Sequence, residues 1–484
     1  MDWYSTESEI KMGKQYAQQI EQSMKLIQDP VVNEYVNRIG QNLVRNSDAR
    51  VPFTIKVIDS DEINAFALPG GYMGVHLGLI AVSSNRDELA AVLAHETSHI
   101  TQRHIARMLA QQNKTTPLML GTMLLGVLAA SRSPDAASAL LIGGQAAAIQ
   151  TQLSFSRDME READRVGFSL MAPAGFQGQG AITLFDKLIQ AARLNDSGAY
   201  PYLRSHPMST ERMADMAGRA QQLTAAETST PPDLVHAMMV GRARALTDLS
   251  PDAQRKLMQN ARLQTPATAK VETTRVGALY AGAVAHMTAR QVSEAEQLLS
   301  VLRGALKGKT AELDQVTWLA AELNMRQGKP LDALQTLDTI SFTGSTTRAQ
   351  RMLKAQALIQ SQQPELARQA VELLDAWLSQ HPRDGQAWDL NGQALGLADE
   401  PLRSLRAQAE ARAVRFDHVA TRKAGQRRFV ELHMHMPAEW SLGRAAALRT
   451  NVEQALMAAV PGLRASIQLL PSDVEAHFDD PVHR

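Results

Sequence analysis

The apolar residues of the first 45 positions recur at intervals of three and four, the spacing of one face of an α-helix. Residues 51–58 then form an apolar run typical of a strand, and residues 65–77 are typical of a β-hairpin with a glycine turn. We therefore expect helix over 7–45, followed by a small sheet. The apolar positions of the helical segment are Ile20, Met24, Ile27, Val31, Tyr35 and Ile39.

The next helix is predicted from its start signals as well as from its apolar stripe. Asn85 is a favourable N-cap residue, and Glu88 follows it at the offset of a capping box. The stripe indicates a helix with one buried face that continues past Met108. It is formed by Leu89, Leu93 and Ile100.

Three further helices are predicted before the first clear linker. They span residues 152–171, residues 181–194 and a segment that begins near Thr210. His206 immediately precedes Pro207. Because the residue before a proline avoids the α region, we expect His206 to lie in a loop.

A stretch rich in Thr, Ser, Ala and Pro separates this region from a uniformly helical one. Beyond it, each unit has a bulky residue that opens the first helix and a small residue in the second. Helix pairs repeating at about 34 residues are typical of tetratricopeptide arrays. The 34-residue pairs are Trp318 with Met352 and Ala333 with Ala367. The expected domains are 1–224, a linker at 225–234, tetratricopeptide-like repeats over 235–420 and a C-terminal extension over 421–484.

The C-terminal extension contains one recognisable element. Residues 429–436 alternate between apolar and polar side chains, as a strand does. His433 and His435 would share one face of it and could bind a metal weakly. The favoured interpretation is an edge strand with its polar residues outward.

Two apolar segments lie between the second and third predicted helices, over 118–130 and 136–149. Neither reaches the roughly 20 residues that a membrane-spanning helix needs. The favoured interpretation of 118–149 is a helical hairpin that packs on the protein. The alternative is peripheral contact with a membrane or with a membrane-protein client.

The composition of the chain excludes several kinds of function and of metal site. The 484 residues carry 50 basic and 50 acidic side chains, so the chain lacks the basic field that binds nucleic acid. It has no cysteine, which excludes disulfides, thiolate metal sites and cysteine nucleophiles. Any metal ion must therefore be held by His, Asp or Glu.

The candidate chemistry lies in the helix that begins near Asn85, which contains the pattern His-Glu-x-x-His. Four residues advance about 6 Å along a helix and turn only about 40°, so His95 and His99 can converge on one metal ion. Zinc accepts such imidazole nitrogens and keeps one position open in catalytic sites. Glu96 is turned by about 100° from His95, which places it beside the ion, where it can hold a water molecule. His104 is turned 140° from His99 and is expected to be structural.

A third protein ligand is expected on the helix over 152–171. Glu160 and Asp164 are four residues apart and share one face, whereas Glu162 points elsewhere. The spacing suggests that one carboxylate binds the metal and the other accepts a hydrogen bond from a ligand histidine. An ordinary charged helix face fits the same spacing equally well.

Three segments together resemble a known family. They are His95-Glu96-x-x-His99, Glu160-x-x-Ala163-Asp164 and the sequence Asn64-Ala65-Phe66-Ala67-Leu68-Pro69-Gly70-Gly71. In these segments the chain is similar to the HtpX and CAAX-prenyl-protease class of gluzincin peptidases, over about residues 8–220. The membrane-integral members of that class have spanning helices that this chain lacks, which favours its soluble branch. The resemblance implies a mostly α chain: a zincin-like metallopeptidase domain with a small sheet, followed by an α-solenoid of tetratricopeptide-like helix pairs.

The resemblance also implies roles for individual residues. His95, His99 and Glu160 would bind one Zn²⁺ per chain, with Glu96 as catalytic base and Asp164 orienting a ligand histidine. His206 matches a loop histidine that can take the open zinc position and keep the enzyme latent. Arg212 matches the arginine after that loop, which would contact the oxyanion. We further expect a substrate segment to add as a strand to the edge formed by residues 72–77.

Partners and location follow from the same resemblance. It implies protein substrates, namely outer-membrane β-barrel proteins, with the repeats binding them or their assembly machinery. No charged and apolar leader opens the sequence, which fits either a cytosolic protein or the mature form of an exported one. The resemblance implies the second, with a periplasmic location.

Three functions compete at this point. The first is a zinc endopeptidase that removes misfolded or assembly-stalled proteins. The second is a chaperone or assembly factor in which proteolysis is secondary, because stacked helix pairs make concave protein-binding surfaces. The third is a scaffold with a dead peptidase domain, and the intact Glu96 argues against it.

Overall fold

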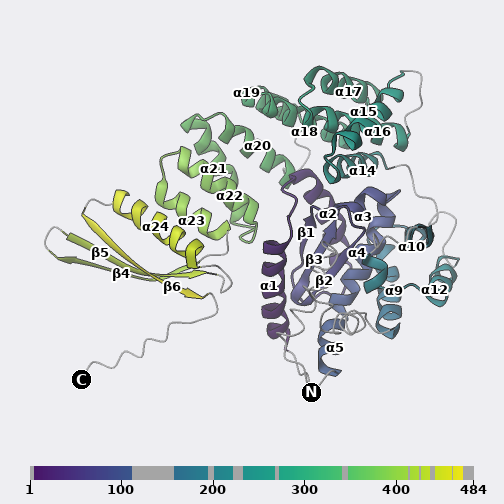
Figure 1. Ribbon diagram of the computed structural model, residues 1–484, viewed down its shortest axis with the longest axis horizontal. Coiled ribbons are helices and arrows are strands. Elements are labelled where there is room, and N and C mark those ends of the chain that lie inside the picture. Colours follow the sequence, from purple (N-terminus) through teal and green to yellow (C-terminus); the bar gives the residue numbers. More distant parts are fainter. Residues whose placement is uncertain are drawn as a thin grey trace. The chain divides into compact units, whose positions relative to one another are not determined.

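The computed structural model describes residues 5–111, 157–194, 201–221, 233–266, 272–340, 347–411, 415–424, 427–436, 442–459 and 462–471. The chain is mostly α-helical, as predicted, and it contains the predicted small sheet and a second one near the C-terminus (Figure 1). It divides into two compact units, Met1–Leu319 and Ala320–Arg484. The expected hairpin over 118–149 lies outside the described residues. None of the described helices is long and apolar enough to cross a membrane.

Unit 1 begins with two helices and a three-stranded sheet. Helix α1 spans Thr6–Ser23 and α2 spans Pro30–Arg45, and the predicted helix over 7–45 is interrupted between them. Asp29 caps α2 by accepting hydrogen bonds from the amides of Val31 and Val32 at 3.0 Å, ahead of Pro30 at the first helical position. The strands are β1 (Thr54–Ile58), β2 (Ala65–Leu68) and β3 (Tyr72–His76).

The sheet order corrects one prediction. Strand β3 pairs with β1 in parallel and with β2 antiparallel, so it is the central strand. The predicted β2–β3 hairpin exists, and its 3₁₀ turn Pro69–Gly71 places Gly70 and Gly71 at φ 73° and 90°. Residues 72–76, however, have both edges paired and cannot accept a substrate strand. The hairpin pattern identified the two paired strands but could not show that a strand 14 residues earlier would pair with the outer edge of β3.

Helix α4 (Arg86–Thr101) has the predicted start. The Asn85 side chain accepts a hydrogen bond from the Glu88 amide at 3.0 Å, and the Glu88 carboxylate accepts one from the Ser84 amide at 2.7 Å. The prediction that this helix runs past Met108 is wrong. It ends at Thr101, Arg103 adopts φ 55°, and a separate helix α5 (His104–Gln111) follows. Arg103 is held in this left-handed conformation by an ion pair with Glu9 on α1.

The rest of the peptidase region is helical. Helix α9 spans Arg157–Met171, α10 Gln179–Leu194, α11 Pro201–Ser205 and α12 Thr210–Ala220. A short helix α3 (Leu77–Val82) connects β3 to α4. Helix α9 crosses α4 closely at Gly167, where a Cβ atom would lie 3.0 Å from the backbone of Ala94 and His95. This glycine brings the polar face of α9 against the His-Glu-x-x-His segment.

A series of helices follows the linker. They are α14 (Leu234–Thr247), α15 (Pro251–Leu263), α16 (Thr273–Thr288), α17 (Val292–Ala305), α18 (Thr310–Arg326), α19 (Pro330–Asp338), α20 (Arg348–Gln360), α21 (Pro364–Leu378), α22 (Gly385–Leu397) and α23 (Pro401–Ala411). Within unit 1, α14 also docks on the peptidase region: His236 bonds the Tyr35 hydroxyl at 2.6 Å, and Arg242 pairs with Asp29 at 2.7 Å. The boundary between the two compact units falls inside α18, and the expected division into domains at 225–234 stays a prediction.

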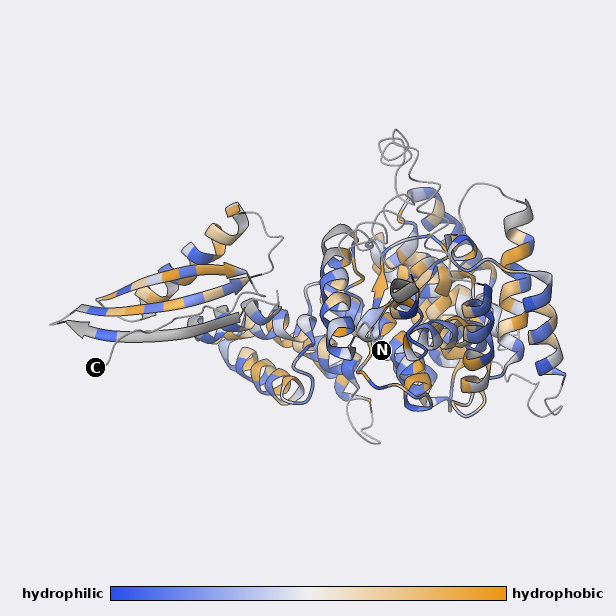
Figure 2. Cartoon of the chain, turned by 90° about the horizontal axis from the view of Figure 1, so that it is seen from below, coloured by the Kyte–Doolittle hydropathy of each residue, from blue (hydrophilic) through white to orange (hydrophobic). Residues whose placement is uncertain are grey.

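The repeat spacing is seen most clearly in the second helix of each pair. Ala295, Ala333 and Ala367 each occupy the fourth position of their helices and are fully buried. The first helices do not share this register, since Tyr280 and Trp318 lie in mid-helix and do not open it. Figure 2 shows hydrophobic and hydrophilic residues alternating along the helical ribbons of the chain. The tetratricopeptide assignment itself stays a prediction.

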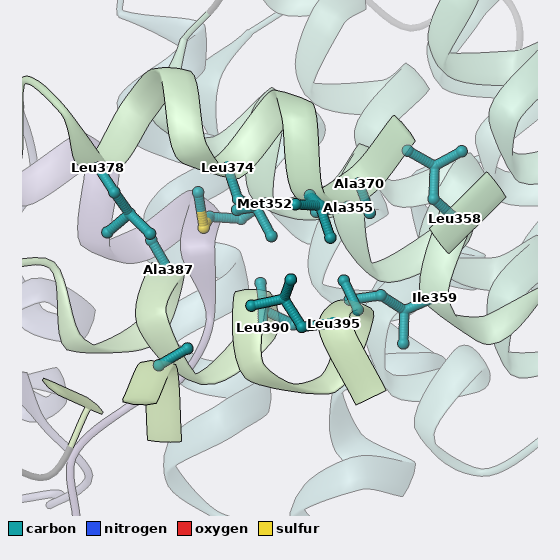
Figure 3. Packing of buried hydrophobic residues seen from close by; sticks show 13 residues of the cluster. Met352, Ala355, Leu358, Ile359, Ala370, Leu374, Leu378, Ala387, Leu390 and Leu395 are labelled. Atoms are coloured by element: carbon teal, nitrogen blue, oxygen red, sulfur yellow. The ribbon is translucent and has the colours of Figure 1, made fainter. Parts of the chain in front are cut away.

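Unit 2 has its own core, built from the facing sides of α20, α21, α22 and α23 (Figure 3). Beneath it, the Asp384 carboxylate accepts hydrogen bonds from Arg348 at 2.7 and 2.8 Å, from the Trp377 indole at 2.9 Å and from the Ala387 amide at 3.2 Å. Burial opposes the charge, but Arg348 outweighs it and holds the pKa of Asp384 below its ordinary value. One carboxylate thus joins three helices and caps α22.

We expect Asp384→Asn to destabilise unit 2 by about 2–3 kcal/mol at pH 7, because Arg348 would lose its buried counter-charge. Since the folded-state pKa is lowered, this contribution exists above pH 3.8 and is lost as the pH falls below it. Urea unfolding of the full chain at pH 7 and at pH 3 measures both effects. Asp252→Asn, at an exposed pair with Arg255, is the matched control and should leave the midpoint unchanged. If Asp384→Asn also leaves the midpoint of urea unfolding unchanged, the expectation is wrong.

The C-terminal region forms a second sheet. Strands β4 (Arg415–Ala424), β5 (Arg427–Met436) and β6 (Leu463–Pro471) lie in the order β4-β5-β6, with α24 (Leu442–Ala459) packed on one face. The predicted strand over 429–436 exists, but it is the central strand, so the edge-strand interpretation is wrong. His433 and His435 lie on the face away from α24 and are buried. Their ring centroids are 6.3 Å apart, and neither belongs to a metal-binding cluster among the described residues.

Candidate metal centre

Four predicted residues meet in the interior of unit 1. His95 and His99 come from α4, Glu160 from α9, and His206 from the segment that follows α11. Each offers one ligand atom, and these four atoms all lie within 4.8 Å of one another. All four residues are at most 2% exposed. Sequence segments more than 100 residues apart therefore supply one compact group of donors.

The distances within this group suit a tetrahedral zinc site. His95 Nε2 lies 3.0 Å from His99 Nε2 and 3.4 Å from Glu160 Oε2, and His99 Nε2 lies 3.6 Å from Glu160 Oε1. Two ligands bound to zinc at about 2.0–2.1 Å in tetrahedral geometry are about 3.3 Å apart. The nitrogen and carboxylate donors are those that zinc prefers in a site without cysteine. The residues present therefore fit the ion.

His206 completes the donor group. Its Nδ1 lies 2.9 Å from Glu160 Oε1 and 3.3 Å from His95 Nε2, while its Nε2 lies 3.5 Å from Glu96 Oε1. The ring packs against Tyr202 at a tilt of 30°, with centroids 4.7 Å apart, and the His206 amide donates a hydrogen bond to the Tyr202 carbonyl. His206 does lie beyond the end of α11, as the following proline predicts. It thus faces both the donor group and Glu96.

Glu96 lies beside this group and is fully buried. Burial raises the pKa of Glu96, although the nearby imidazoles of His206 and His95 counter part of the rise. The Tyr202 side chain also counters part of the rise. A buried carboxylate in this state is suited to taking a proton from a small molecule placed beside it.

The carboxylate of Asp164 backs His95. Its Oδ1 lies 3.1 Å from His95 Nδ1, the ring nitrogen that faces away from the donor group. Arg212 clamps the same carboxylate from behind, at 2.6 and 2.7 Å. This is the arrangement expected for a carboxylate that fixes the orientation of a metal-ligating imidazole.

Arg212 is fully engaged within the protein. Besides Asp164, its Nη1 contacts Glu160 Oε2 at 2.8 Å and donates to the Pro207 carbonyl at 2.7 Å. Each of its three nitrogens therefore has a partner. In this arrangement Arg212 holds two carboxylates and the chain next to His206, and its expected contact with an oxyanion stays a prediction.

The protonation of the site follows from these contacts. Burial opposes a charge on His95, but the hydrogen bonds that it donates to Asp164 and Glu160 outweigh this effect and raise its pKa to about 10. Burial and the charge on His95 hold the pKa of His99 well below its ordinary value. Burial also opposes a charge on Glu160, but His206 and His95 outweigh it and hold its pKa well below the usual range. A divalent cation would take the place of the His95 proton.

Sequence reasoning missed a second set of partners. His104, expected to point away from the site, is fully buried and places its Nδ1 2.8 Å from His99 Nδ1. Its Nε2 lies 3.1 Å from the carboxylate of Glu162, a residue that was also set aside. The 140° argument assumed an unbroken helix, and the break at Arg103 invalidates it. No local pattern in the sequence predicts that break in the helix.

A buried His₂Glu donor group on two helices, with a second glutamate beside it in His-Glu-x-x-His, defines a metallopeptidase of the zincin type. Comparison with known families agrees: peptidase family M48 matches residues 30–220. The chain belongs to this family and is a zinc metallopeptidase.

Among individual proteins, the chain is similar to the β-barrel assembly-enhancing protease of Escherichia coli, with 33% identity over 407 residues that cover 84% of this chain and 80% of that protein. The protein of that name from Yersinia pestis is 32% identical over 405 residues, covering 82% and 80%. A mitochondrial metalloendopeptidase of Schizosaccharomyces pombe is 32% identical over 184 residues, covering 37% and 50%. Residues 403–472 separately match the cytoplasmic domain of cation efflux proteins.

Proposed function

We propose that this chain is a zinc endopeptidase, latent at rest, that cleaves misfolded or assembly-stalled outer-membrane β-barrel proteins in the periplasm. The observation that carries the peptidase proposal is the convergence of His95, His99 and Glu160 beside Glu96. The client class rests on the likeness to the β-barrel assembly-enhancing proteases, and so does the location. One zinc ion per chain would occupy the site.

The chemistry would divide between the ion and Glu96. When bound, zinc supplies Lewis acidity that makes a water molecule more acidic and polarises a peptide carbonyl. Glu96 would take the proton from the attacking water and later deliver it to the leaving amine. Burial raises the pKa of Glu96, which makes its carboxylate a better proton acceptor than an exposed one. Asp164 and Arg212 would keep His95 in the tautomer whose Nε2 faces the ion.

The substrate would bind along the outer edge of β2, not along residues 72–77. Strand β2 pairs only with β3 among the described strands, so its other edge is open, and it packs against α4. An extended client segment could add there as a fourth strand, close to His95 and Glu96. Outer-membrane β-barrel clients that have not closed expose such extended segments.

Latency would come from His206. Its Nδ1 occupies the fourth donor position and its Nε2 faces Glu96, so it covers both the metal position and the base. A substrate carbonyl and the attacking water need that same space. Cleavage would therefore require the segment after α11 to move away.

A second candidate function is supported by this same closed arrangement. A chain whose active site is covered at rest could act mainly as a chaperone or assembly factor, with its helical repeats binding clients or the assembly machinery. A cleavage assay on a casein-type unfolded protein separates the two functions. The endopeptidase proposal requires zinc-dependent cleavage, whereas zinc binding without cleavage, even after removal of His206, would favour the chaperone.

We expect His206→Ala to raise the rate of cleavage by about 10- to 100-fold if the covered state makes up 90–99% of the chains. The rate of peptide release and the zinc content should be measured on the same samples. His286→Ala, at an exposed hydrogen bond with Gln291 on the repeats, is the matched control and should leave the rate unchanged. A His206→Ala chain that keeps its zinc but cleaves no faster would rule out the latch.

A further inference from the structure

A line of polar side chains runs from the metal centre to the protein surface. It begins at His99, whose Nδ1 lies 2.8 Å from His104 Nδ1, and continues from His104 Nε2 to Glu162 Oε2 at 3.1 Å. Arg107 ends the line by donating to the same Glu162 oxygen at 2.7 Å. The side chains of His99 and His104 are fully buried, whereas those of Glu162 and Arg107 are 24% and 47% exposed.

A break between helices α4 and α5 places His104 beside His99. Helix α4 ends at Thr101, two residues after His99, and Arg103 takes the left-handed conformation with φ 55°. Non-glycine residues adopt this conformation rarely and at a cost, so something must hold Arg103 in it. Its side chain forms an ion pair with Glu9, and its amide donates a hydrogen bond to the Ile100 carbonyl at 3.0 Å. The turn points the first residue of α5, His104, back at the last metal ligand of α4.

The hydrogen positions in this line follow from the donor role of His99. Its Nε2 faces His95 and Glu160, so Nδ1 must carry the proton when the neutral ring binds a cation. That N–H can donate to His104 Nδ1 at 2.8 Å, and this nitrogen is then the unprotonated one. The proton of His104 consequently sits on Nε2 and is donated to the Glu162 carboxylate. This combination of tautomers satisfies both hydrogen bonds of the line.

Each of the two ligand histidines is thus contacted from behind by a polar side chain, but the side chains differ. His95 is backed by the Asp164 carboxylate, which Arg212 holds. His99 is backed by an imidazole, then a carboxylate, then Arg107. Each line ends in an arginine–carboxylate pair, but the second is longer by one ring and reaches the surface.

We propose that His104 is a positioning residue for the metal centre, anchored by Glu162, and that it fixes the tautomer and orientation of His99. This inference rests on the proposed zinc site, but not on its catalytic activity. Loss of a partner behind a metal-ligating histidine costs 10- to 100-fold in metal affinity in comparable sites. A histidine that merely fills space in the core would have no such effect once its volume is replaced.

The test measures zinc affinity by competition with a chromophoric chelator in the full-length chain. His104→Phe fills the same space but cannot accept a hydrogen bond, and we expect it to weaken zinc binding by about 10- to 100-fold. His104→Gln has an oxygen that can accept from His99 and an amide that can donate to Glu162, so it should recover most of the affinity. A role in packing alone predicts the opposite order, since Phe replaces the ring better than Gln.

Two further variants keep the inference testable if His104→Phe folds poorly. Glu162→Ala removes the anchor at a partly exposed position and should weaken zinc binding by up to about tenfold. Glu211→Gln, whose carboxylate pairs with Arg161 at 2.6 Å near the surface of the same region, is the matched control and should not change it. Nitrogen-15 spectra of the zinc-loaded chain should show His99 protonated at Nδ1 in wild type and in the control.

The outcomes separate this inference from the proposed function. If the wild type binds zinc and all three variants bind it with the same affinity, the positioning role is wrong but the proposed function stands. The three variants are His104→Phe, His104→Gln and Glu162→Ala. Absence of zinc binding by the wild-type chain would overturn the proposed function, and this inference with it. Weakened affinity in His104→Phe with recovery in His104→Gln supports it.

Discussion

Replacing Glu96 with Gln should reduce cleavage by at least 10²–10⁴-fold while leaving zinc bound. General acid–base catalysis by a positioned side chain contributes this much, and an amide cannot accept the proton of the attacking water. Glu96 is not one of the four clustered donors, so the metal content should match that of the wild type. Peptide release from an unfolded substrate, together with zinc analysis of the same preparation, measures both.

The stability of this variant provides an internal control. Burial raises the pKa of Glu96, which means that its charged form destabilises the folded state above its ordinary pKa of 4.5. Gln has the same shape without the charge, so the melting temperature should stay the same or rise. A Glu96→Gln chain that folds, binds zinc and still cleaves at the wild-type rate would show that Glu96 is not the base.

The second large effect is expected at Glu160. Glu160→Ala should abolish zinc binding at concentrations that saturate the wild type, because it removes the only carboxylate among the four clustered donors. It should also destabilise the metal-free chain by about 3–5 kcal/mol, since Arg212 and His95 would lose a buried counter-charge. Isothermal titration with zinc and urea unfolding in the presence of a chelator measure the two effects. Asp158→Asn, an exposed acid on the same helix, is the control and should change neither.

The metal-free chain should also show a defined pH dependence. The pKa of Glu160 is held below its ordinary 4.5, so its contribution to stability is lost as the pH falls below that value. The pKa of His95 is raised from 6.5 to about 10, so its contribution is full below pH 6.5 and is lost as the pH rises toward 10. Together these two groups therefore stabilise the fold most between about pH 4.5 and 6.5, and Glu160→Gln should flatten the acid side of the stability profile. If the stability of Glu160→Gln falls as steeply at acid pH as that of the wild type, other carboxylates cause the acid dependence.

The parts of the site that sequence could predict are those fixed by helical geometry. His95 and His99 are one turn apart on one helix, and Glu160 and Asp164 are one turn apart on another, so each pair shares a face whatever the rest of the chain does. Which carboxylate binds the metal was not decidable from spacing. The structure places Glu160 among the donors and Asp164 behind His95 because Gly167 sets where α9 crosses α4.

The parts that sequence could not predict depend on where the chain turns. His104 joins the site only because Arg103 breaks the helix, and the ion pair that holds Arg103 comes from Glu9, 94 residues earlier. Strand β3 is central because of a parallel partner from outside the hairpin. The C-terminal strand over 429–436 was recognised by its alternation, but its central position depends on β6, which follows after an intervening helix.

The central claim is that His95, His99 and Glu160 bind a single zinc ion. Anomalous diffraction data collected on either side of the zinc absorption edge, from crystals of the full chain grown without added chelator, test it directly. We predict one peak per chain, contacted by Nε2 of His95, Nε2 of His99 and the Glu160 carboxylate. A map with no anomalous peak between these three side chains, from protein supplied with zinc, would contradict it.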